Sequence, residues 1–463
     1  MRPSTGVADG EVGSSLAFGT ALSLIALTAF VIRVAYVTMV ARHVALGFDA
    51  VWYTFESGPL AHGKGFVDPA VYFQSAHSVP TAVHPPLYPV FLAAITRIFN
   101  GHDETFRLIG AAAGTVTVVC TGFIGRRVAG PRVGLVAAGL AAIYPSLIAV
   151  DGSLMSETIA VPLLLGMTWL ALATIERPSR WRFALLGVLG GLTTLARSDA
   201  VIAAALVIMT AAFAVARGRR ARALLGLTAV ATLALVVTPW AVRNDVRVGT
   251  PAIATLSTAT TISGANCQST YAGPLLGYWD PTCLDEQRRG TLDEATWNSR
   301  ETQYGLDYAR AHVSRMPLVV VARELRVLGL FHPLAQARLD ATETRSYRWQ
   351  LLAWAAWLPV MGLGALGLLR IARARGRAAL PLFGVVAAVA ITVAVSYGNA
   401  RFRTACEPVF LVGAAELLAS SGSRRLVGAA RRVVGRRTGP RIPAASPASP
   451  VPMSTPRSAP RTT

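Results

Sequence analysis

Residues 200–242 read AVIAAALVIMTAAFAVA, then RGRRAR, then ALLGLTAVATLALVVTPWAV. The two apolar runs, 200–216 and 223–242, contain no charged residue, whereas the segment between them includes four arginines. A helix of roughly 20 apolar residues crosses a bilayer, and short arginine-rich loops are typical of the cytoplasmic side. This stretch therefore predicts two membrane-spanning helices joined by a cytoplasmic loop.

The same pattern recurs along most of the chain. Eight more apolar runs predict spans at 15–40, 105–124, 133–149, 155–175, 183–196, 350–369, 378–395 and 405–419. The first run is too long for the apolar part of a signal peptide and lacks a clear cleavage site, so it predicts an uncleaved anchor. We therefore expect an all-α integral membrane protein with about ten transmembrane helices, give or take one. A charged fraction of only 15% agrees with this fold class.

Two other apolar stretches predict helices that do not span the membrane. Residues 84–99 contain three prolines near their start, where a helix tolerates them best. We expect a re-entrant or interfacial helix there. Residues 316–333 carry charges within a wide apolar stripe, which predicts a helix lying on the outer leaflet.

The distribution of arginine predicts the orientation. The net charge of +20 resembles that of a nucleic-acid-binding protein, but 24 of the 44 basic residues lie in segments that a cytoplasmic N-terminus places inside, against three acids. The other 20 basic residues lie with 21 acids in the remaining segments and spans. The excess of charge is therefore a positive-inside signal. It predicts a multi-pass protein of the cell membrane with both termini cytoplasmic, and no nucleic-acid partner.

This orientation divides the chain into five regions. They are a cytoplasmic N-terminus (1–14), a transmembrane region (15–242) with a first external loop (41–104), an external segment (243–349), C-terminal transmembrane helices (350–420) and a basic, mostly disordered cytoplasmic tail (421–463). All seven histidines lie in the two external segments. We therefore expect the chemistry of the protein on the outer face.

Asp49 is the first candidate for that chemistry. It follows the first predicted span in the sequence GFDAVWY, at the expected membrane surface, and a helix would place Tyr53 and Glu56 on its face. A carboxylate at this boundary suits a general base that takes a proton from an acceptor hydroxyl. The alternative is an ordinary solvated loop acid.

Further charged residues lie at the expected outer ends of spans. Glu157 begins one span, where it either acts chemically or stabilises the helix N-terminus. Arginine suits phosphate oxygens because its guanidinium is a planar fork, and the candidates for binding a phosphate are Arg197, Arg243, Arg401 and Arg403. The alternatives are a local pair of Arg197 with Asp199, a pair of Arg403 with Glu407, and snorkelling. Arg33 lies near enough to the outer end of the first predicted span to snorkel, and no role is assigned to it.

The cysteines predict one disulfide bond. Cys267 and Cys283 lie in an external segment, where an oxidising environment favours their bonding. Cys120 and Cys406 fall in predicted spans and are expected to pack. No pair of external histidines has the spacing of a metal site. No cofactor and no metal-binding residue is therefore predicted, with a divalent metal as the weaker alternative.

Several of these motifs together resemble the C-type glycosyltransferases (GT-C fold) that are related to protein O-mannosyltransferases and aminoarabinose transferases, and in particular their family-39-like membrane proteins. The motifs that carry the resemblance are GFDAVWY (47–53), HPPLYP (84–89), PWAVRN (239–244) and YGNARFR (397–403). The similarity extends over about residues 31–419.

The resemblance implies an inverting glycosyltransferase. Such enzymes move a sugar from a polyprenyl-phosphate donor to a hydroxyl on a glycan, lipid or protein at the outer face of the membrane. Asp49 matches the catalytic acid of their first loop. Since Ala50 stands where mannosyltransferases have a second acid, Glu56 and Glu157 are alternatives for that role. The residues expected to contact the acceptor or the sugar, a hexose or a pentose, are Tyr53, His84, Tyr88, Asp199 and Asn399.

Two other functions remain open from the sequence. A polytopic transporter or flippase for a lipid-linked envelope precursor would place charges near the bilayer midplane and break helices in paired halves. An inert scaffold for envelope assembly would need no link between Asp49 and the arginines. The gathering of charges at the expected outer ends of the spans favours glycosyl transfer.

Overall fold

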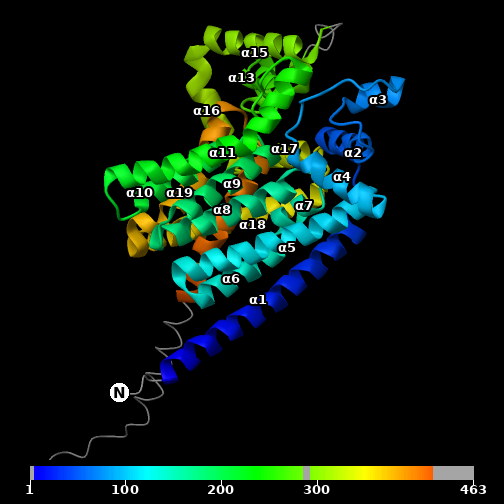
Figure 1. Ribbon diagram of the computed structural model, residues 1–463. Coiled ribbons are helices and arrows are strands. Elements are labelled where there is room, and N and C mark those ends of the chain that lie inside the picture. Colours follow the sequence, from blue (N-terminus) through cyan, green and yellow to red (C-terminus); the bar gives the residue numbers. More distant parts are fainter. Residues whose placement is uncertain (1–4, 285–291, 421–463) are drawn as a thin grey trace, which may run out of the picture. The chain divides into compact units, whose positions relative to one another are not determined.

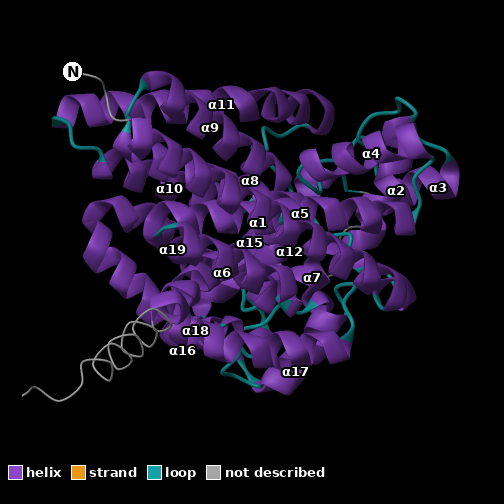
Figure 2. Ribbon diagram, turned by 90° about the horizontal axis from the view of Figure 1, so that it is seen from below, coloured by secondary structure: helices purple, strands orange, loops and turns teal. Residues whose placement is uncertain are grey.

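The computed structural model describes residues 5–284 and 292–420. The predicted disordered tail, residues 421–463, lies outside the described residues, as do 1–4 of the predicted N-terminus. Within the described ranges the chain is helical, with one isolated bridge between Val67 and Pro80 and no strand (Figure 2). The expected all-α fold is confirmed.

Long apolar helices form the main bundle, and each of the ten predicted spans falls on part of it. Its members are α1 (Thr5–Met39), α5 (Asp103–Ala129), α6 (Pro131–Ile143), α7 (Pro145–Asp151), α8 (Glu157–Glu176), α9 (Arg180–Ala196), α10 (Ala200–Ala214), α11 (Arg219–Val248), α18 (Tyr347–Arg375), α19 (Leu380–Val395) and a last helix at 407–420. Among the described residues five helical stretches are long and apolar enough to cross a membrane, or six if the bent pair α6–α7 is one span. The protein is thus a multi-pass membrane protein, and the count of ten spans stays a prediction.

The two predicted external segments form shorter helices. The first contains α2 (Phe48–Ala61), α3 (Pro69–Ser75) and α4 (Leu87–Phe99); the second contains α12 (Thr258–Ala265), α13 (Gln268–Tyr271), α15 (Glu294–Ala311), α16 (Met316–Val327) and α17 (Pro333–Ala341). Figure 1 shows α2, α3 and α4 close together and α13, α15 and α16 grouped at the top of the view. Helices are present at both stretches expected to be interfacial, as α4 and α16. The second ends at Val327, short of 333, because Gly329 takes a positive φ of 73° that ends the helix.

Small residues allow the bundle helices to approach closely. A Cβ atom at Gly187 of α9 would lie 2.0 Å from the carbonyl oxygen of Ala229 in α11, and one at Gly367 of α18 would lie 1.8 Å from that of Gly413. Close packing at small residues is the usual way in which helices associate in lipid. The largest buried apolar cluster joins α5, α6, α8, α9, α10, α11, α18 and α19 with the last helix.

One predicted span, 133–149, is broken. The chain bends by 60° between α6 and α7, at Pro145, which lacks the N–H that a continuous helix needs. The buried guanidinium of Arg33 donates hydrogen bonds to the carbonyl oxygens of Ala141 and Ala142, at 3.4 and 3.1 Å. It also pairs with Asp151, Nε to Oδ2 2.6 Å. Arg33 therefore satisfies carbonyl groups at the break and does not snorkel.

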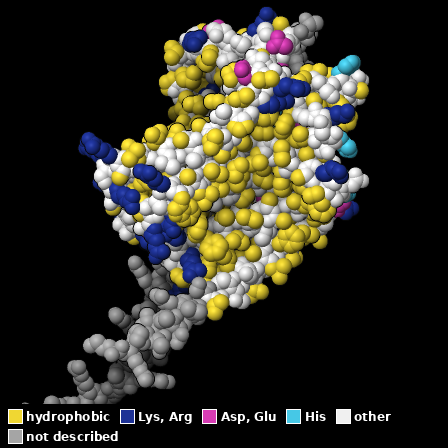
Figure 3. All heavy atoms as spheres, in the orientation of Figure 1, with side chains coloured by type: hydrophobic (Ala, Val, Ile, Leu, Met, Phe, Trp, Pro, Cys, Tyr) yellow, Lys and Arg dark blue, Asp and Glu magenta, His cyan; other side chains and the backbone are white. Residues whose placement is uncertain are grey.

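The surface agrees with a membrane location. Figure 3 shows a broad hydrophobic area across the middle of one face. Lys and Arg side chains gather at its lower left, whereas acidic and histidine side chains appear only at the top and right. An apolar band between two polar edges is the surface that a bilayer requires.

Candidate active site

Arg401 lies at the centre of a cluster of ionisable side chains, which we call the acid–arginine cluster. Its Nη1 atom lies 3.2 Å from Asp49 Oδ2 and 2.8 Å from Glu343 Oε2, and its Nε atom lies 2.9 Å from Glu157 Oε1. Asn399 fixes this arrangement because its Oδ1 accepts from the Arg401 backbone N–H and its Nδ2 donates to Glu343. Arg401 thus connects the first predicted external loop, the start of α8 and the loop before α18.

Arg197 is the second arginine of the cluster. It contacts the same oxygen of Glu157, at 2.6 Å, and pairs with Asp199 at 2.8 Å. Its guanidinium also lies 5.5 Å from the centre of the Phe402 ring. Glu157 therefore bridges the two arginines as well as beginning α8. The local pair of Arg197 with Asp199 is also present.

A narrow apolar groove opens beside the two arginines, with a cavity volume of about 40 Å³. Its walls come from α8, α9, α10 and α19 and from residues 397–405. The polar residues Glu157, Arg197, Asp199 and Arg401 stand together among the residues that line it, and the rest are Ala160, Val161, Leu164, Thr193, Ala200, Ala203, Val385, Ala388, Val389, Thr392, Phe402 and Ala405. The groove thus combines long apolar walls with a pair of cations.

Asp49 lies in the first turn of α2, where the helix dipole favours an acid. Its side chain is 34% exposed, so it remains accessible while it pairs with Arg401. Burial would raise the pKa of Asp49, but the charges of Arg401 and His84 outweigh that effect and lower it below its ordinary value. Asp49 is therefore a carboxylate at neutral pH.

Aromatic rings surround Asp49 on the α2–α4 side. The centre of the His84 ring lies 4.5 Å from that of Tyr53 and 5.8 Å from that of Trp52, and Tyr53 packs edge-on against Tyr88 at 4.9 Å. Burial lowers the pKa of His84, opposed by the charge of Asp49. The sequence motifs GFDAVWY and HPPLYP thus fold into one aromatic wall.

The loop between α17 and α18, residues 342–346, contributes residues that the sequence analysis missed. Glu343 binds Arg401, and Thr344 Oγ1 accepts a hydrogen bond from the backbone N–H of Gly47, at 2.6 Å. Gly47 has no Cβ, and one built there would lie 2.2 Å from a carbonyl oxygen of this loop. The same loop contains Arg345, which is 3% exposed. Nothing in the short polar sequence TETR marks it as part of a site, because its role arises from contacts distant in sequence.

Two predicted site residues lie outside the acid–arginine cluster. Glu56 is buried on α2, and its Oε2 has no hydrogen-bond partner among the described residues. Arg243 donates to the carbonyl oxygens of Phe66 and Thr81 and stacks on Trp240. Burial raises the pKa of Glu56 to about 8, although the charge of Arg243 opposes it. These two residues tie α2 and the loop after it to the end of α11.

Arg403 also lies away from the groove. It pairs with the buried Glu407 at 2.7 Å and donates to the carbonyl oxygen of Val327. Its guanidinium lies 5.0 Å from the centre of the Trp357 ring. This geometry matches the predicted alternative in which Arg403 pairs with Glu407, and it connects neighbouring structural elements.

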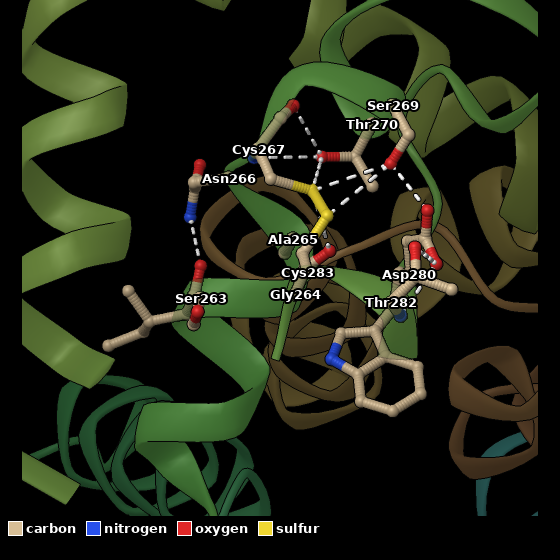
Figure 4. The surroundings of a disulfide bond; sticks show 12 residues. Ser263, Gly264, Ala265, Asn266, Cys267, Ser269, Thr270, Asp280, Thr282 and Cys283 are labelled. Atoms are coloured by element: carbon tan, nitrogen blue, oxygen red, sulfur yellow. Dashed lines mark hydrogen bonds between the residues drawn. A yellow bond between two sulfur atoms is a disulfide. The ribbon is translucent and has the colours of Figure 1, made fainter. Parts of the chain in front are cut away.

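Cys267 and Cys283, the predicted pair, form a disulfide bond (Figure 4). Ser269 in the loop that it closes donates to Asp280, at 2.5 Å. The same loop reaches the 397–403 segment, where the N–H of Gly398 donates to the carbonyl oxygen of Gly277. The disulfide therefore supports the loop that packs beside Asn399 and Arg401. Cys120 and Cys406 are free, half-buried and buried respectively.

The described side chains include no group of three or more His, Cys, Asp or Glu residues placed to hold a metal ion. The acidic residues of the cluster instead share the two arginines.

Comparison with known proteins shows which protein family and which solved structures this chain resembles. A family model described as dolichyl-phosphate-mannose-protein mannosyltransferase matches residues 83–242. No curated protein sequence matches the chain significantly. The match includes the HPPLYP motif, α8 and Arg197.

Solved structures are similar over nearly the whole chain. One is the archaeal oligosaccharyltransferase AglB from Archaeoglobus fulgidus in complex with an inhibitory peptide and a dolichol-phosphate, with a TM-score of 0.52 and 15% identity over 93% of this chain and 53% of its own. Another is the oligosaccharyltransferase of the same organism tethered to an acceptor peptide, with a TM-score of 0.52 and 16% identity over 88% and 50%. ArnT from Cupriavidus metallidurans bound to undecaprenyl phosphate is less similar, with a TM-score of 0.41 and 15% identity over 88% of this chain and 78% of its own.

The chain spans about half the length of the oligosaccharyltransferase that it matches. At this level of identity the similarity identifies the fold. It agrees with the resemblance that the sequence motifs predict and with the family model for residues 83–242. The protein therefore has the GT-C fold of the membrane-embedded C-type glycosyltransferases.

Proposed function

We propose that this protein is an inverting glycosyltransferase that moves a sugar from a polyprenyl-phosphate donor to a hydroxyl acceptor on the outer face of the membrane. The single observation that carries the proposal is the pairing of the accessible Asp49 carboxylate with Arg401, whose side chain also lines the apolar groove. In this pair the Asp49 carboxylate can remove a proton and the Arg401 guanidinium can stabilise a phosphate. The apolar walls of the groove suit the lipid part of the donor.

The groove matches the two parts of such a donor. A prenyl chain buries apolar surface against alanine, valine and leucine side chains. Its phosphate would meet Arg197 and Arg401, which suit phosphate oxygens. The oligosaccharyltransferase with the same fold binds a dolichol-phosphate, which supports this donor class.

The chemistry follows from the placement of Asp49. The acceptor oxygen attacks the anomeric carbon, the bond from that carbon to the phosphate oxygen breaks, and the polyprenyl phosphate leaves with the electron pair. Asp49 accepts the proton of the acceptor hydroxyl as the new bond forms. The negative charge that develops on the phosphate is stabilised by the arginines. Attack from the face opposite the leaving phosphate inverts the anomeric centre.

Other residues have supporting roles in this proposal. His84 is the half-buried member of the aromatic group beside Asp49 and is the one placed to meet a sugar or acceptor, whereas Tyr53 and Tyr88 are buried and support it from behind. Asp199 and Asn399 border the arginines. Of the two candidates for a second acid, Glu157 is in the cluster and Glu56 is not. Glu157 bridges both arginines, so we assign it to their positioning.

One feature bears on the alternative of a transporter or flippase. The Arg33–Asp151 pair is buried within predicted spans, where an ion pair often marks a transport path. Here the pair has a structural role, because Arg33 donates hydrogen bonds to carbonyl groups that the break between α6 and α7 leaves free. Glycosyl transfer therefore remains the better-supported function.

The experiment is transfer by purified membranes supplied with a panel of polyprenyl-phosphate hexoses and pentoses. Asp49→Asn should reduce transfer by about 10²-fold or more, the usual contribution of a general base, without loss of protein. Asp307→Asn, at an exposed acid of α15, is the matched control and should retain full activity. Undiminished transfer by Asp49→Asn would refute the assignment.

A further inference from the structure

Arg345 has unused hydrogen-bonding capacity beside the acid–arginine cluster. Its side chain is 3% exposed, and its Nε and Nη2 atoms have no hydrogen-bond partner among the described residues. Leaving buried donors unpaired is costly, more so when the group is charged. A buried arginine with two free donors therefore indicates that something else accepts from them.

The neighbours of Arg345 bring its loop to the edge of the acid–arginine cluster, and Arg345 itself lies behind the residues that line the groove. Glu343, two residues before Arg345, forms an ion pair with Arg401. Thr344, the residue between them, accepts a hydrogen bond from the backbone N–H of Gly47, which lies two residues before Asp49. Arg345 itself interacts electrostatically with Glu157, which lines the groove, and with Asp340 of α17. The loop that carries Arg345 is thus held from both sides by residues of the cluster.

The backbone of this loop supports a specialised role. Thr344 adopts a positive φ of 61°, which is unfavourable for a β-branched side chain. Such conformations persist where the surrounding contacts require them. Here the contact is the hydrogen bond from Gly47, and the consequence is a fixed position for the next residue, Arg345.

The two other arginines of the site are already neutralised. Arg401 contacts Asp49, Glu157 and Glu343, and Arg197 contacts Glu157 and Asp199. Counted as ionised groups, these four carboxylates and two guanidinium groups carry a formal net charge of about −2. A phosphate that approached only Arg197 and Arg401 would have to displace carboxylates from them. Arg345 feels the charges of Glu157 and Asp340, but no described carboxylate is hydrogen-bonded to its Nε or Nη2 atom, so a phosphate could bind these donors without displacing one.

We infer that Arg345 binds the phosphate group of the lipid-linked donor through its free Nε and Nη2 atoms, an inference that rests on the proposed function. Adjacent Nε and Nη2 donors are parallel, which matches two oxygens of one phosphate. Arg401 and Arg197 then act chiefly to position Asp49 and Glu157, and they contact the phosphate as its charge grows.

The test measures binding in detergent, so that neither the sugar nor the acceptor needs to be known. The probes are a polyprenyl monophosphate, the corresponding polyprenol and inorganic phosphate, each titrated against the purified full chain with intrinsic tryptophan fluorescence as the readout. Wild type should bind the polyprenyl phosphate, and bind the polyprenol and inorganic phosphate much more weakly. R345Q should raise the Kd for the polyprenyl phosphate by about 10- to 100-fold, the effect of losing a charge-assisted pair of hydrogen bonds.

R338Q is the matched control, because Arg338 is exposed on the neighbouring helix α17, and its Kd should equal that of wild type. If R345Q does not fold, R345K is measured in its place. Lysine keeps the positive charge but lacks the paired guanidinium donors, so the Kd for the polyprenyl phosphate should still rise about 10-fold. An unchanged Kd in a folded Arg345 variant would overturn the inference while leaving the proposed function standing. Equal binding of inorganic phosphate would overturn the assignment to a lipid, and a wild type that binds no polyprenyl phosphate would overturn the proposed function itself.

Discussion

Asp49 and Glu56 lie two turns apart on α2, yet their surroundings shift their pKa values in opposite directions. Both are buried against protein to some extent, which favours the neutral acid. Asp49 meets Arg401 at 3.2 Å and stays ionised. Within the described part of the chain, Glu56 has an unpartnered Oε2 atom and no ion pair of comparable geometry, and burial raises its pKa to about 8. The difference explains why Asp49 suits proton removal and Glu56 does not.

The raised pKa of Glu56 makes the stability of the protein depend on pH. The ordinary pKa of the carboxyl is 4.5 and the folded value is about 8, so between these values the folded protein keeps a proton that the unfolded chain releases. The stabilisation is present below pH 4.5 and is lost as the pH rises through 8. We expect up to about 1.4 kcal/mol of unfolding free energy to be lost per pH unit within this window.

The measurement is the Tm of purified protein in detergent between pH 5 and pH 8. Glu56→Gln cannot ionise, so its Tm should fall less over this range than that of wild type. The difference between the two proteins isolates Glu56 from other groups that titrate, and Asp307→Asn should follow wild type. Parallel curves for wild type and Glu56→Gln would mean that Glu56 is ionised in the folded protein.

At the scale of helices, the break between α6 and α7 depends on a side chain from a third helix. Arg33 of α1 donates to Ala141 and Ala142 and pairs with Asp151. Removing one partner of a buried ion pair leaves an uncompensated charge. The bend is therefore expected to depend on α1, although Pro145 permits it.

Arg33→Met should destabilise the protein by about 3–5 kcal/mol, the usual cost of breaking a buried pair from one side. Arg33→Met combined with Asp151→Asn removes the stranded charge and should regain part of that loss, so the two substitutions should not be additive. Thermal unfolding in detergent measures all three proteins. Arg42→Met, at an exposed arginine just after α1, should change the Tm little, and an equally small effect of Arg33→Met would show that the break is stable without it.

For the whole molecule, what the sequence predicts depends on whether a property is local or arises from distant contacts. Helices and spans follow from runs of apolar residues, so all ten predicted spans fall on helices. Their common place at one end of the spans predicts that Asp49 groups with Arg197, Arg243, Arg401 and Arg403. The structure brings Arg401 and Arg197 into the cluster of Asp49, whereas Arg243 and Arg403 lie outside it. The contributions of Glu343 and Arg345 could not be anticipated, because a short polar loop gives no sign of the residues it will meet. The break at Pro145 had a local signal, the proline itself, but its partner Arg33 lies more than a hundred residues away.

The orientation of the molecule is a property of the whole charge distribution, and it decides which side the acid–arginine cluster serves. The arginine-rich loops predict that residues 217–222 face the cytoplasm and that α2 and α3 face outward. We expect an impermeant maleimide applied to intact cells to label Gln74→Cys, at the exposed end of α3, and not Gly218→Cys, in the exposed loop before α11. Both substitutions are made with Cys120 and Cys406 replaced by alanine, and both should be labelled once detergent opens the membrane. The membrane spans connect the loops that contain positions 74 and 218. If the orientation of the protein were reversed, both positions would therefore change sides of the membrane together. Labelling of Gly218→Cys alone would therefore place Asp49 and the groove on the cytoplasmic side, where the donor would have to be supplied from the inner leaflet.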